Sequence, residues 1–167
     1  MNYYDKALEN LKNENYDVAA DYFFSHLYCN NSIKDYPPSE YLCKYNHTDI
    51  ITEEIRNNVK EYYRNIIEQN QDDNEIKASS YARLGMILFY IDKDNFMELF
   101  NLVYNLSNNY FLLNNIGLIL LKNGKRNESV QFLEKAKKYQ IVLYLKLFLI
   151  YIQHIHIITN LINPFIV

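Results

Sequence analysis

The chain has 167 residues, of which 49% are apolar and 22% are charged, so it can bury a core and is not disordered by composition. It contains only three glycines and three prolines, and this scarcity of turn residues disfavours an all-β sandwich and a doubly wound α/β fold. The net charge of −3 argues against a basic face that binds nucleic acid.

Two short amphipathic helices are predicted near the N-terminus, over residues 3–12 and 16–29. Tyr4, Ala7, Leu8 and Leu11 recur at helical spacing in the first of them. The chain begins without an apolar signal segment, and two cysteines make no disulfide framework. We therefore expect a cytoplasmic protein.

Residues 30–51 form the clearest irregular stretch. Pro37 and Pro38 forbid a helix there and favour an extended segment. A loop of this length is unusual within a domain, and it is either functional or poorly ordered.

A histidine and a cysteine lie on each side of these prolines. His26 with Cys29 and Cys43 with His47 resemble the ligand set of a structural zinc site. Their spacing matches no known zinc module, and a buried free cysteine beside a surface histidine explains the same residues. We predict no bound metal and no cofactor, and a zinc measurement would test this.

The middle of the chain predicts further helices separated by short polar breaks. Thr52 is a candidate N-cap, and the acidic Glu53 and Glu54 suit the first turn of a helix. The predicted helices cover residues 52–70, 75–91, 94–106, 110–123 and 127–140. Breaks this short make consecutive helices antiparallel.

One pattern occurs twice in the chain with the same internal spacing. Tyr81, Leu84, Gly85 and Leu88 return as Leu113, Ile116, Gly117 and Leu120. Two of the three glycines thus fall inside predicted helices, where each costs about 1 kcal/mol relative to alanine. A helix keeps such a residue where another helix must approach closely.

This pattern resembles the tetratricopeptide repeat family. That family places an aromatic residue, Leu-Gly and a bulky residue on one helix, and a small residue followed by a large one on the next. Ser129, Leu133 and Ala136 supply the second-helix spacing after Gly117. The resemblance is specific over residues 78–140 and weak over 3–29. The closing proline of the family is absent from every unit.

The resemblance implies an all-α fold in which antiparallel helix pairs stack into a right-handed superhelical solenoid. In the family, the first helices of successive pairs line a concave groove that holds a peptide or a partner's helix. The groove residues of this chain would include Arg83, Met86, Tyr90, Asn114, Asn115, Leu118 and Lys122. Arg83 and Asn115 occupy equivalent slots. A simple solvated helix face remains the alternative interpretation.

Residues 141–167 are strongly apolar and interrupted by single polar residues. A membrane anchor, a helix packed on the last repeat and a truncated end are the three interpretations. Lys146, Gln153 and His154 would be expensive inside a bilayer. We therefore favour the packed helix, with some surface left for a partner, over the membrane.

The sequence divides into an N-terminal helix pair (1–29), a loop (30–51), a repeat region (52–140) and an apolar C-terminal segment (141–167). No phosphate-binding loop, His-Glu-x-x-His motif or nucleophile elbow occurs, so we predict no catalytic residues and no enzyme. The first hypothesis is a non-enzymatic module that binds a protein or peptide partner. The alternatives are an accessory segment of a larger enzyme system and a membrane-tethered assembly protein.

Overall fold

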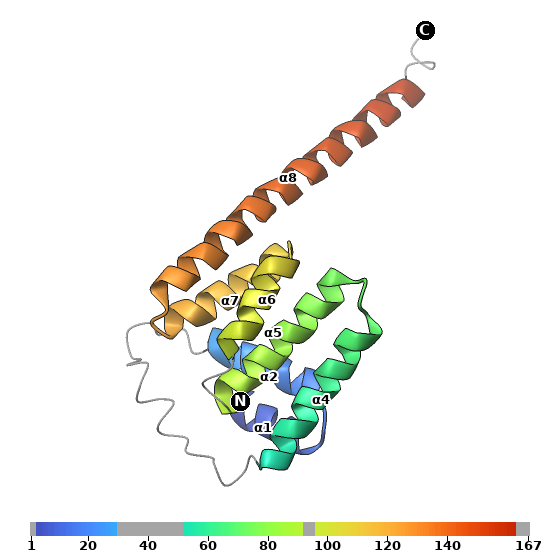
Figure 1. The fold of residues 1–167 in the computed structure, drawn as a ribbon. Coiled ribbons are helices and arrows are strands. Elements are labelled where there is room, and N and C mark those ends of the chain that lie inside the picture. The colour runs from blue at the N-terminus through green and yellow to red at the C-terminus, as the bar shows by residue number, and fades with distance from the viewer. Residues whose placement is uncertain (1–2, 30–51, 92–95, 163–167) are drawn as a thin grey trace.

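The computed structural model describes residues 3–29, 52–91 and 96–162, and for 27–29, 146 and 150–162 it describes the backbone alone (Figure 1). These ranges contain seven helices and no strand, so the all-α prediction is confirmed. The helices are α1 (Tyr3–Lys12), α2 (Tyr16–Cys29), α4 (Glu53–Gln69), α5 (Asn74–Ile91), α6 (Phe96–Leu106), α7 (Tyr110–Lys122) and α8 (Arg126–Ile162). The loop predicted over 30–51 lies outside the described residues.

The starts of two helices are fixed by side-chain caps that the sequence shows directly. The Thr52 hydroxyl accepts a hydrogen bond from the Ile55 amide at 3.3 Å at the start of α4. The Asn109 side chain accepts bonds from the Phe111 and Leu112 amides at 3.0 and 3.3 Å at the start of α7. Each cap satisfies amides that have no partner within the helix. These signals are local, and the predicted starts therefore agree with the structure within one residue.

Two helices end in a left-handed residue. Gly124 has φ of 71° after α7, and the Lys125 amide donates back to the Leu120 carbonyl at 3.0 Å. Glu14 has φ of 60° after α1, and the Asn15 amide donates back to the Asn10 carbonyl at 2.9 Å. Both are Schellman-type ends, which usually carry glycine at the left-handed position. Glu14 therefore has a backbone conformation that glycine adopts at a lower free-energy cost.

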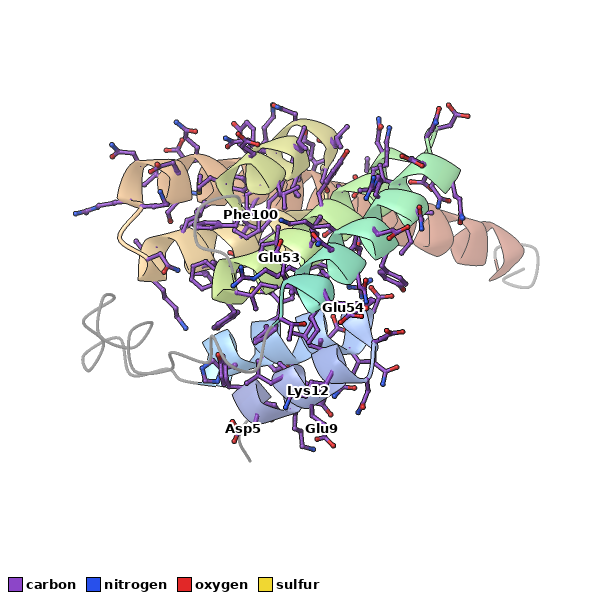
Figure 2. All side chains as sticks on the ribbon, turned by 60° about the horizontal axis from the view of Figure 1, so that its bottom comes forward. Asp5, Glu9, Lys12, Glu53, Glu54 and Phe100 are labelled. Atoms are coloured by element: carbon purple, nitrogen blue, oxygen red, sulfur yellow. The ribbon has the colours of Figure 1, made fainter. Side chains whose placement is uncertain are left out.

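The helices pack as consecutive pairs. α1 packs on α2, α5 on α6, and α7 on α8, while α4 and α2 each pack against α5 (Figure 1). α1 buries one apolar face and leaves Asp5, Glu9 and Lys12 exposed (Figure 2). α5 is central and is buried on all sides over residues 84–89. The core runs through these pairs, with Phe23, Tyr63, Phe100 and Phe132 among its largest side chains.

The two glycines of the repeated pattern have equivalent surroundings. A Cβ built on Gly85 would lie 2.7 Å from the ring of Phe100, on α6. A Cβ built on Gly117 would lie 2.7 Å from the side chain of Leu133, on α8. Ser129 also donates a hydrogen bond of 2.8 Å to the Gly117 carbonyl. At both glycines, therefore, the next helix approaches more closely than a Cβ would allow, as the sequence pattern predicted.

The last helix is longer than the sequence pattern predicts. α8 continues past Gln140 to Ile162 without a break, so the apolar C-terminal segment is not a separate element. Beyond Gln140, α8 extends away from the other helices (Figure 1). The described large apolar side chains of residues 141–149 are exposed. The expected packing of this segment onto the last helix pair is therefore not found for the described side chains.

Candidate functional site

One face of α7 carries four of the seven predicted binding residues. Asn114, Asn115, Leu118 and Lys122 lie on the side opposite to the buried residues Leu113, Ile116, Gly117 and Leu120, and all four are partly exposed. Phe111, one turn before them, is 62% exposed. We call residues 111, 114, 115, 118 and 122 the α7 face. It combines two apolar side chains, two amides and one ammonium group.

The equivalent face of α5 is covered by α2 of the same chain. Ala82 and Met86 occupy the slots of Asn114 and Leu118, and both are fully buried. Met86 therefore belongs to the core, and it offers no surface to a partner in this structure. Because α2 packs along α5, an amphipathic helix already fills the first half of the surface that the repeat pattern marked for binding.

Arg83 is held by two acidic residues of α2. Its guanidinium lies 3.6 Å from the Asp17 carboxylate and 3.5 Å from the Asp21 carboxylate. All three side chains keep substantial contact with solvent, which screens the ion pairs. Arg83 thus orients α2 on α5, whereas the repeat spacing predicts a place next to Asn115 in an open groove.

Asp17 also joins α2 to α4. Tyr62 donates its hydroxyl to one carboxylate oxygen of Asp17 at 2.9 Å, and Tyr63 donates to the other at 3.0 Å. Burial, with the nearby Asp17 charge, raises the pKa of Tyr63 far above its ordinary value and raises the pKa of Tyr62 as well. Both phenols therefore stay protonated and act as hydrogen-bond donors. Helical spacing assigns both tyrosines to the apolar stripe of their helix, and it does not predict this cluster.

Tyr90 and Lys122 occupy equivalent positions in the repeated pattern, and both lie near the C-terminal end of α2. The Tyr90 ring stacks on Phe23 with centroids 4.4 Å apart, and it meets Tyr4 and His26 at 5.7 and 6.1 Å. Burial, followed by the positive charge of Lys122, lowers the pKa of His26, and Asp5 partly opposes this. Burial also lowers the pKa of Lys122. Tyr90 is therefore part of an aromatic cluster, and Lys122 is the cation at its edge.

The zinc hypothesis is only partly covered by the structure. His26 is a described side chain, whereas Cys29 is described by its backbone alone, and Cys43 and His47 lie outside the described residues. Among the described side chains, no three histidine, cysteine, aspartate or glutamate residues come together as a metal-binding group. The absence of zinc stays a prediction.

Comparisons with known proteins give no further identification. No family model, curated protein sequence or solved structure matches this chain. In the part of the chain that the structure describes, no helix combines the length and the apolar character needed to cross a membrane.

Proposed function

We propose that the chain is a non-enzymatic protein-interaction module, built as a tetratricopeptide-like solenoid, that binds an amphipathic helix of a partner protein on its α7 face. The repeat supports this proposal. Gly85 and Gly117 both make close contacts with the helices that follow them, as the first helices of two repeat units would.

One observation indicates that the partner of the α7 face is an amphipathic helix. The α5 face is covered by α2, an amphipathic helix whose Asp17 and Asp21 pair with Arg83 and whose Phe23 stacks on Tyr90. The equivalent α7 face is partly exposed. We therefore take the contact between α2 and the α5 face as the model for how a partner helix would bind the α7 face.

The chemistry of the α7 face narrows the partner further. Phe111 and Leu118 are apolar contacts at helical spacing, and partners of this kind insert side chains at i, i+3, i+4 and i+7. Asn114 and Asn115 offer both donors and acceptors. Lys122 offers a cation to an acidic residue of the partner. We expect a partner helix with two or three apolar residues on one side and at least one carboxylate near Lys122.

Site-specific photo-crosslinking tests the proposal. A crosslinking amino acid at Leu118 should give a discrete adduct in an extract of the source cells. The same residue at Leu102, which is 40% exposed on α6, is the control and should not give that adduct. Identical adducts from the two positions, or none from Leu118, would contradict the proposed face.

The identified partner allows a second measurement. Leu118→Asp should weaken its binding at least tenfold, because a carboxylate would replace an apolar contact. Leu102→Asp should stay within twofold of the original affinity. Far-ultraviolet circular dichroism of both variants shows whether the fold is kept. Equal losses for the two variants would place the partner elsewhere.

A further inference from the structure

The part of α8 beyond Gln140 is the largest run of exposed apolar side chains in the described structure. Eight large apolar residues, from Ile141 to Leu149, have exposed fractions between 38% and 60%. They are Ile141, Val142, Leu143, Tyr144, Leu145, Leu147, Phe148 and Leu149. An exposed apolar run of this kind marks a surface that another body covers.

These side chains surround the helix and do not form one stripe. Successive residues of an α-helix are about 100° apart, so five apolar residues in a row, 141–145, reach every side of it. A protein partner with a single binding face would cover one side only. A surrounding apolar medium covers all of them.

The charges of the chain change sign where this run begins. Glu134 is the last acidic residue, and the segment after it contains Lys135, Lys137, Lys138 and Lys146. Residues 135–167 therefore carry a formal charge of +4. Residues 1–134, with 13 basic and 20 acidic residues, carry −7. Lys137 and Lys138 are exposed on the turns of α8 just before the apolar run.

We propose that residues 141–149 insert into one leaflet of an anionic lipid bilayer, while Lys137 and Lys138 contact the headgroups. Nine helical residues span about 14 Å, which is roughly half of the ~30 Å hydrocarbon core. Residues 141–149 therefore match the depth of one leaflet, and the backbone of α8 continues beyond them to Ile162. Lys146 lies about 8 Å along the helix from Ile141, a depth from which lysine side chains reach back to the headgroups. Binding of such segments grows with the buried apolar area and with attraction between lysines and anionic lipids.

A second copy of the chain is a weaker candidate for the same segment. The other exposed large apolar residues that the structure describes are distributed over five helices, with one or two on each: Val18, Ile76, Leu102, Phe111, Leu121 and Val130. The body of a second copy thus offers scattered apolar residues to a segment that is apolar on every side. The net negative charge of that body would attract Lys137 and Lys138, so the experiment must distinguish self-association from lipid binding.

Vesicle flotation of the full chain tests the proposal. The chain should float with vesicles of phosphatidylcholine and phosphatidylglycerol, and binding to phosphatidylcholine alone should be at least tenfold weaker. Each lysine near an anionic surface strengthens binding about fivefold, so the double variant Lys137→Glu, Lys138→Glu should lose more than tenfold on anionic vesicles.

A matched pair of variants separates insertion from general surface effects. Phe148 and Phe111 are 60% and 62% exposed on α8 and α7, so Phe148→Asp and Phe111→Asp make the same chemical change at equal exposure. We expect Phe148→Asp to reduce vesicle binding at least tenfold and Phe111→Asp to leave it within twofold. Partner binding on the α7 face should respond in the opposite way, so the two proposals fail independently.

Three results would overturn the proposal. The first is no flotation with anionic vesicles, and the second is equal losses for Phe148→Asp and Phe111→Asp. The third is a stable dimer, measured by light scattering without lipid, that Phe148→Asp dissociates and that does not float with vesicles. This last result would assign the segment to a second copy.

Discussion

Gly85→Ala tests the claim that α5 and α6 touch at the glycine. The added Cβ would lie 2.7 Å from the Phe100 ring, against at least 3.4 Å in an ordinary contact, so the ring must retreat by about 0.7 Å. Phe100 is fully buried and meets the Phe96 ring edge-on at 5.6 Å, so its retreat disturbs a packed neighbour. Overpacking of this kind costs about 1–3 kcal/mol. The higher helix propensity of alanine offsets about 1 kcal/mol of this packing cost.

We therefore expect Gly85→Ala to lower the free energy of unfolding by up to about 2 kcal/mol, or Tm by up to about 8 °C for a chain of this length. Urea and thermal unfolding, followed by circular dichroism, measure the effect. Gly117→Ala should cost at least as much, because the Cγ of Leu133 lies as close as its Cδ2, at 2.7 Å, and the Leu133 backbone nitrogen lies at 3.3 Å.

A double-variant cycle with Phe100→Leu isolates the contact, since leucine vacates the ring position. The two changes should couple favourably by at least about 1 kcal/mol. A stabilising Gly85→Ala, or strictly additive effects in the cycle, would refute the close approach of the two helices.

Three further changes test other parts of the structure, each by the same unfolding measurements. Glu14→Gly should stabilise the chain by about 0.5–1 kcal/mol because Glu14 is left-handed, and destabilisation would contradict that end of α1. Asp17→Ala should cost about 1–3 kcal/mol because it leaves the buried Tyr63 hydroxyl without its acceptor, and Asp17→Asn, which keeps an acceptor, should cost less. The pKa of His26 is lower in the folded chain than its ordinary 6.5, so the unfolded chain takes up a proton first as the pH falls. The free energy of unfolding should therefore decrease as the pH drops through about 6.5. His26→Gln should remove this pH dependence, and a pH profile that the variant leaves unchanged would contradict the assignment to His26.

The helix bounds were predictable because their signals are local. Thr52 and Asn109 precede helices that they cap, and Gly124 follows a helix that it ends. The continuation of α8 also had a signal, since no glycine or proline occurs between Lys125 and Asn163. The boundary predicted at 141 rests on a change of composition there. Such a change alters what a helix contacts without ending the helix.

The covering of α5 by α2 was not predictable from repeat spacing. It depends on Asp17 meeting Arg83, which lies far along the chain, and on Tyr62 and Tyr63 arriving from a third helix. Periodicity places Arg83 on a face of its helix, but it does not say which other helix of the chain covers that face. Repeat spacing therefore predicts one continuous groove on α5 and α7, whereas the α5 face is covered by the chain itself.

The two halves of the repeat thus differ in a way that bears on function. Met86 corresponds to Leu118 and Arg83 to Asn115 in the repeated pattern, yet Met86 is fully buried while Leu118 and Asn115 are partly exposed. Both glycines are closely approached by the next helix, so the difference that bears on binding lies in the side-chain face and its cover. The α5 face carries a cation where α2 presents carboxylates, and the α7 face carries an amide in the same slot. We therefore expect an acidic residue of a partner on the α7 face to contact Lys122, which lies further along the helix. A partner whose acidic residue instead contacts Asn115 would show that the contact between α2 and α5 does not predict how the α7 face binds.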